Sequence, residues 1–194
     1  MKKLSPRFSA RCSWMSSLPR ADAVVDAYED QVEALEALHH QRAKLSNSTA
    51  SRFHGLTPEE IAQRLERDRA ELDQWALLMV LASFEATVRE DVRLRHGRKT
   101  KDAVRPSLQM LEQANPGRVR FDDILSAWDA ASSVGQDLKG RVRNLMKHRH
   151  WLAHGRYWTN KHGQVPSPLD ALGYLDDYCI KLRMRVPTFP LGGT

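Results

Sequence analysis

Apolar residues recur at steps of three and four along most of the chain, which is the spacing of one face of an α-helix. In the first such segment, residues 21–45, the apolar stripe consists of Val25, Tyr28, Val32, Leu35 and Leu38. The residues that follow, 46–51, are small and polar. The pattern therefore predicts a first helix over 21–45 and then a loop.

The second helix has a clear start at residues 57–60, which read Thr-Pro-Glu-Glu. A Thr at the N-cap, a Pro at the first helical position and a Glu at the third predict a capping box. The helix should continue to about His96, where Gly97 can end it. Residues 75–84 are apolar nearly all round this helix. That segment is predicted to lie at the centre of a bundle or between two subunits.

Shorter helices with short links are expected in the remainder of the chain. Their predicted ranges are 102–113, 121–132, 134–154 and 167–185. Short links between amphipathic helices predict an all-α fold, an antiparallel helical bundle with additional short helices. The expected organisation is a basic N-terminal arm over 1–20, one helical domain over 21–186 and a loose C-terminal tail over 187–194.

The chain lacks the long apolar run of a membrane span, which needs about 18 residues or more. Residues 1–20 are basic and contain no acid, and Ser and Arg interrupt every apolar stretch there. A basic arm is therefore expected instead of a secretory signal, with an organelle-targeting peptide as the alternative. Cys12 and Cys179 are far apart in sequence, which predicts neither a disulfide framework nor a zinc ribbon and favours a reducing cytoplasm.

Charge is distributed unevenly along the chain, whose formal net charge is +6 and whose isoelectric point is about 9.5. No Asp or Glu occurs between Leu138 and Leu169. The basic residues of this window are Lys139, Arg141, Arg143, Lys147, Arg149, Arg156 and Lys161. A segment with positive charges and no acid predicts a surface that binds phosphate groups. A basic helix face that is simply solvated would show the same sequence pattern.

The end of this basic helix carries an Arg, four intervening residues and a His, namely Arg149 and His154, and residues 153–155 read Ala-His-Gly. This resembles the R-x4–6-H signature of the HEPN superfamily, whose active helix often closes with Ala-His-Gly. A second pair of the same spacing, Arg143 and His148, lies in the same helix. Arg149 and His154 are favoured because a His at a helix end can be partly exposed.

The resemblance implies an endoribonuclease that needs no metal or other cofactor. His154 would act as general base or acid, since imidazole exchanges protons near neutral pH. Arg149 would donate to phosphate oxygens and stabilise the charge of the transition state. Five helical steps separate the two residues by about 140°. In HEPN proteins the motif helices of two protomers meet, so a homodimer is implied. A toxin or phage-defence setting, with an antitoxin as a partner, follows from analogy alone.

Two further residues are predicted to support this site. His150 lies one turn before His154, where it is either a second proton carrier or phosphate donor, or else a surface His. Glu85 lies in the most apolar helix, and a carboxylate there needs a cation. Arg149 is a candidate partner that Glu85 would orient, and a solvent-facing Glu or a purely structural ion pair is the alternative.

Residues around the motif are predicted to bind RNA, namely Arg143, Lys147, Arg156 and Tyr157. The Tyr157 ring could stack on an unpaired base or pack in the core. His150 and His154 have a spacing that could chelate zinc, but the window has no acid and no nearby Cys, so no metal site is expected. The rival interpretation of the whole chain is a non-catalytic HEPN-like module that binds RNA or another protein.

Overall fold

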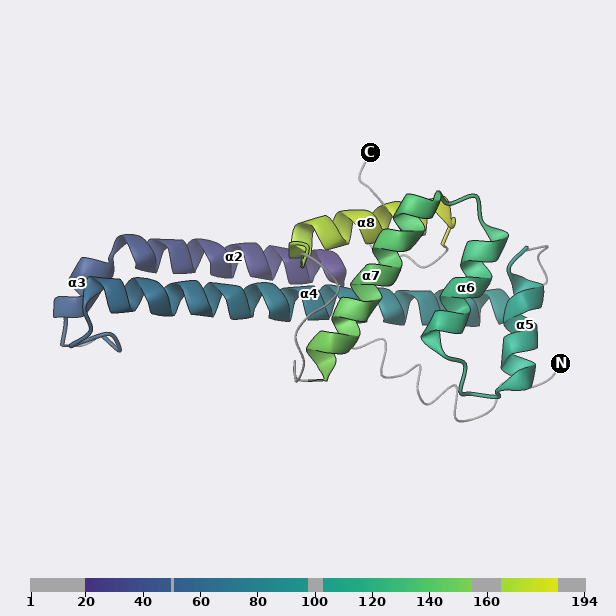
Figure 1. Cartoon of the computed structure of the whole chain (residues 1–194), viewed down its shortest axis with the longest axis horizontal. Helices are drawn as coiled ribbons and strands as arrows, with labels where there is room; N and C mark the ends of the chain where they lie inside the picture. The colour runs from purple at the N-terminus through teal and green to yellow at the C-terminus, as the bar shows by residue number, and fades with distance from the viewer. Residues whose placement is uncertain (1–19, 50, 98–102, 155–164, 185–194) are drawn as a thin grey trace.

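A computed structural model describes residues 20–49, 51–97, 103–154 and 165–184. These residues form helices and no strand, which confirms the predicted all-α class (Figure 1). The helices are α2 (Ala21–His40), α3 (Arg42–Asn47), α4 (Pro58–Gly97), α5 (Arg105–Ala114), α6 (Phe121–Ala131), α7 (Gln136–Ala153) and α8 (Pro168–Lys181). Within the described residues, no helix is both long and apolar enough to cross a bilayer. The predicted C-terminal tail, and the N-terminal arm up to residue 19, lie outside the described residues.

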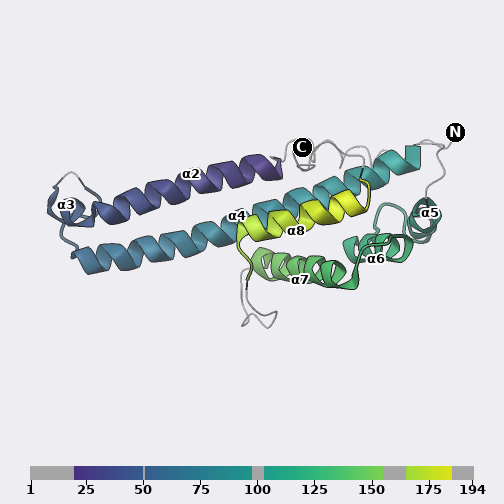
Figure 2. The same ribbon diagram turned by 90° about the horizontal axis from the view of Figure 1, so that it is seen from above.

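The long helix α4 is the element against which the rest of the fold packs. Its 40 residues correspond to a length of about 60 Å. Helix α2 runs antiparallel to the first half of α4, and α3 lies at the far tip of this hairpin (Figure 1). Helices α5 to α8 gather around the second half of α4, and α8 lies along it (Figure 2).

The predicted first helix, 21–45, is divided into two. Helix α2 ends at His40, Gln41 leaves the helical conformation with φ −95° and ψ 6°, and α3 begins at Arg42. The single-helix prediction was therefore wrong at this point. No Gly or Pro marks the break, so its cause is tertiary: the chain must turn at the tip to reach the start of α4.

Hydrogen bonds confirm the predicted starts of α4 at residues 57–60 and of α8 at residue 167. At α4, the Thr57 backbone N–H donates to Glu60 Oε2 (2.8 Å) and the Glu60 N–H donates to Thr57 Oγ1 (3.2 Å). At α8, the N–H of Asp170 donates to Ser167 Oγ at 3.1 Å. Helix α8 ends at Lys181, which is earlier than the predicted residue 185.

The main hydrophobic core lies around the second half of α4. Leu77, Val80, Leu81 and Phe84 have no exposed surface, as expected for the centre of a bundle. Trp75, at the start of the same apolar segment, is 46% exposed. A separate small core at the tip of the hairpin is formed by Phe53, Ile61 and Leu65.

A buried ion pair lies near the end of α4. Arg95 Nε is 2.5 Å from Asp91 Oδ2, and both side chains are almost completely buried. The Arg95 guanidinium lies over the Trp128 ring of α6, 4.2 Å from its centroid, and donates to the carbonyl of Arg183 after α8. This one side chain therefore links three segments of the fold.

Candidate nucleic-acid interface

Helix α7 presents a stripe of basic and imidazole side chains on its outer face. Arg143, Lys147, His150 and His154 follow one another at steps of four, three and four, so they share one side of the helix. All four are exposed, whereas the opposite side buries Val142 and Leu145. We call these four residues the α7 stripe. Among the described residues, no carboxylate lies within ion-pairing distance of Lys147.

Arg149 points away from this stripe, toward α4. Its Nη2 lies 2.7 Å from Glu85 Oε2, so the candidate ion pair between Arg149 and Glu85 is present. The other oxygen of Glu85 binds Arg89, at 2.8 Å from Nη2 and 2.9 Å from Nε. The Glu85 side chain is 16% exposed and that of Arg149 34%. Glu85 thus holds two guanidinium groups while leaving part of Arg149 accessible.

A cavity of about 890 Å³ opens between α4, α6 and α7. We call it the basic cavity, because more Arg and Lys side chains than carboxylates line it. The cations are Arg89, Arg120, Arg143, Lys147 and Arg149, and the carboxylates are Glu85 and Asp122. His150 also lines it. The fold therefore gathers most of the predicted site residues around one concave surface that suits an anion.

Sequence reasoning missed Arg89 and Arg120. Arg89 follows Glu85 by one helical turn, which was a signal for an ion pair between them. Arg120, the N-cap residue of α6, is exposed and belongs to a different part of the chain. Nothing in the sequence connects it to α7, since its position depends on how α6 packs.

His154 does not line the basic cavity, but its ring contacts that of His150, which does line it. The rings of His150 and His154 lie 4.2 Å apart between centroids, with their planes tilted by 58°. His154 is the C-cap residue of α7, and its N–H donates to the His150 carbonyl at 3.2 Å. The two imidazoles therefore form an exposed pair at one edge of the basic cavity.

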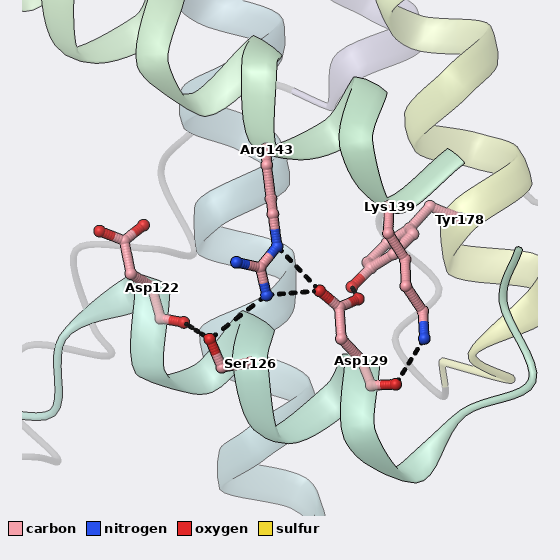
Figure 3. Close-up of polar contacts among 6 residues, drawn as sticks. All are labelled: Asp122, Ser126, Asp129, Lys139, Arg143 and Tyr178. Carbon is pink, nitrogen blue, oxygen red and sulfur yellow. Dashed lines mark hydrogen bonds and ion pairs between the residues drawn. The ribbon is translucent and has the colours of Figure 1, made fainter. Parts of the chain in front are cut away.

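Arg143 is less available to a ligand than the sequence indicated, as Figure 3 shows. Its Nη2 and Nε lie 2.8 and 3.0 Å from Asp129 Oδ2. The other oxygen of Asp129 accepts from Tyr178 Oη at 2.8 Å, and its backbone carbonyl accepts from Lys139 Nζ. Asp129 thus compensates the Arg143 charge and joins α6, α7 and α8. Burial, and next the hydrogen bond to Asp129, raise the pKa of Tyr178.

The alternative pair of the same spacing, Arg143 and His148, differs from Arg149 and His154 in the burial of its imidazole. Arg143 lies on the exposed stripe, while His148 is 2% exposed and faces the other side of α7. The imidazole of this alternative pair is thus buried, whereas that of His154 is exposed. The predicted RNA-binding residues Arg156 and Tyr157 lie outside the described residues.

Over the described part of the chain, no group of three or more His, Cys, Asp or Glu side chains could hold a metal ion. Comparison of the chain with protein-family models, curated proteins and solved structures finds no match.

Proposed function

We propose that this chain is a metal-independent endoribonuclease of the HEPN type, with Arg149 and His154 as its catalytic residues. The observation that carries the proposal is the placement of Arg149 by Glu85 in a basic cavity whose edge bears the His150–His154 pair. Arg supplies fixed charge for a phosphate, and His supplies proton transfer near neutral pH.

In the proposed reaction His154 removes the proton of a ribose 2′-hydroxyl. The 2′-oxygen then forms a bond to phosphorus, and the bond from phosphorus to the 5′-oxygen breaks. A protonated imidazole of the His150–His154 pair delivers a proton to the departing oxygen, so the products carry a 2′,3′-cyclic phosphate and a 5′-hydroxyl. Arg149 donates to the non-bridging oxygens, where negative charge accumulates in the transition state.

A homodimer completes the proposed site. Arg149 faces α4, whereas His154 lies on the exposed stripe, so a single copy presents them in different directions. A twofold dimer that brings two copies of α7 together would set the His154 of one copy against the Arg149 of the other. The setting in a toxin–antitoxin or phage-defence system, with an antitoxin as partner, is proposed only by analogy with HEPN proteins.

A non-catalytic RNA-binding module is the second candidate. It is favoured by the absence of His154 from the lining of the basic cavity, and by the ion pair that already occupies Arg149. In that case the α7 stripe would hold phosphates, and His154 would only cap the helix. A protein-interaction module without RNA is the third outcome.

The decisive experiment incubates the full chain with RNA in excess EDTA. Wild type is compared with Arg149→Ala and His154→Ala, and the matched controls are Arg67→Ala and His54→Ala, exposed residues on the α2–α4 hairpin. We expect cleavage in EDTA that both site variants lose and both controls keep. Cleavage that survives in both site variants contradicts the proposal. Binding without cleavage by wild type supports the second candidate.

A further inference from the structure

A second cavity, of about 730 Å³, lies on the opposite side of α7 from the basic cavity. We call it the polar cavity. Helix α7 contributes Asn144, His148 and Trp151, which share a face at steps of four and three. The rest of the lining comes from α4, from α8 with Tyr174, and from residues 165–167.

The two cavities differ in charge. Among the described residues that line the polar cavity there are one Arg, Arg141, and two carboxylates, Asp73 and Asp170. Arg141 is already engaged, because its Nε lies 2.9 Å from Asp137 Oδ2 and its Nη1 lies 3.0 Å from Tyr174 Oη. A phosphate would therefore gain little in this cavity and would be repelled by its acids.

The lining suits a neutral, flat and polar group. Asn144 is exposed and offers both an amide donor and an amide acceptor. Trp151 is half-buried at the wall and supplies an aromatic ring, while Ala70 and Leu145 add apolar surface. Amide groups that read polar edges beside aromatic rings are the usual means by which proteins recognise unpaired nucleobases.

The two cavities lie on opposite sides of α7, so the width of one helix separates them. An α-helix with its side chains is about 10 Å across, so a few nucleotides of single-stranded RNA suffice to cross α7. The exposed side chains on the way are Lys147 of the α7 stripe and Asn144. Lys147 lines the basic cavity and Asn144 lines the polar one. The phosphates of one strand would therefore lie beside an ammonium group, and a base of the same strand beside an amide.

We propose that the polar cavity is a nucleobase subsite and that Asn144 is its specificity-determining residue. The inference rests on the proposed function, since it requires RNA on the basic cavity. The strand passes over α7 with its phosphates beside Lys147, and one base enters the polar cavity. There Asn144 hydrogen-bonds the base edge and Trp151 contacts the ring.

The test measures binding of fluorescently labelled, 2′-O-methylated homopolymers of U, C, A and G, which have no free 2′-hydroxyl and cannot be cleaved. The full chain is compared with Asn144→Ala. Gln136→Ala is the matched control, because Gln136 is another exposed amide on α7 and lines neither cavity. Lys147→Ala reports the phosphate contribution. Wild type should prefer one base. Asn144→Ala should lower the affinity for that homopolymer by about fivefold or more. The affinities for the other three homopolymers and the salt dependence should stay unchanged, so the preference is lost.

The outcomes distinguish a failure of the nucleobase subsite from a failure of the proposed function. If wild type binds the homopolymers and Lys147→Ala weakens all of them, but Asn144→Ala weakens none or all alike, the nucleobase subsite is overturned while RNA binding stands. If wild type binds none of them, the proposed function is overturned and the subsite with it. A loss of preference in Gln136→Ala equal to that in Asn144→Ala also overturns the role of Asn144.

Discussion

Glu85 of α4 and Arg149 of α7 are joined by an ion pair, with 2.7 Å between Oε2 and Nη2. The same carboxylate binds Arg89 through its other oxygen. One acid therefore fixes the position of two guanidinium groups in the basic cavity and offsets part of their charge. If Arg149 acts in catalysis, Glu85 is a positioning residue, and its removal should affect binding and rate in opposite directions.

Glu85→Gln should raise the affinity of the chain for RNA and lower the rate of cleavage. Affinity rises because the basic cavity loses a negative charge, and the rate falls because Arg149 is no longer held. We expect the rate to fall by about tenfold or more, as for loss of a positioned transition-state contact. Single-turnover cleavage and equilibrium binding measure the two quantities separately.

Glu90→Gln is the matched control for this prediction. Glu90 is on the same helix and pairs with Arg93, but it lies outside the basic cavity. It should leave both quantities near wild type. A parallel decrease of affinity and rate in Glu85→Gln would show that Glu85 only maintains the fold.

Lys147→Ala should weaken RNA binding more than Arg143→Ala. Among the described residues, no carboxylate lies within ion-pairing distance of Lys147, whereas Asp129 compensates the charge of Arg143. Each lost phosphate contact on a single strand lowers the slope of log K against log salt by about 0.7. Binding titrations at several salt concentrations should show this decrease for Lys147→Ala and a smaller one for Arg143→Ala. Equal decreases would contradict the assignment of Arg143 as a largely structural residue.

Arg95→Ala should strongly destabilise the fold, because it removes the buried ion pair with Asp91 and the contact with Trp128. Breaking a buried pair in this way costs about 3–5 kcal/mol. Urea unfolding measures the loss. The double variant Asp91→Leu with Arg95→Met should be more stable than Arg95→Ala, since it removes both charges. A double variant no more stable than Arg95→Ala would argue against the loss of the ion pair as the cause.

Tyr178 should make the stability of the fold decrease at alkaline pH. Its pKa is raised in the fold, first by burial and then by Asp129. The unfolded chain therefore loses the phenol proton at lower pH than the folded chain does. The stabilisation is fully present below the ordinary tyrosine pKa of about 10 and is lost as the pH rises above it.

Tyr178→Phe tests this pH dependence. At neutral pH it should cost about 1–2 kcal/mol, because Asp129 Oδ1 loses its buried donor. Above the tyrosine pKa its unfolding free energy should decline less steeply than that of wild type. Denaturant unfolding from neutral to alkaline pH gives both numbers, and identical slopes for the two proteins would contradict the shift.

The helical segments were predictable because each depends on local chemistry. Apolar spacing placed α4 and α7, and short-range hydrogen bonds at Thr57 and Ser167 started α4 and α8 where expected. The break at Gln41 was not predictable, because no local signal opposes the helix there. It follows from the return of the chain toward α4, which is a property of the assembled hairpin.

The sequence by itself determined the α7 stripe, since helical periodicity alone aligns Arg143, Lys147, His150 and His154. It also indicated that Glu85 needed a cation, because a carboxylate among apolar residues is costly without one. Only the tertiary structure decided that Arg89 shares Glu85 and that Arg120 joins the same cavity. The compensation of Arg143 by Asp129 likewise depends on α6 lying against α7. Periodicity fixes neighbours within one helix, whereas contacts between helices are fixed by how their buried faces pack.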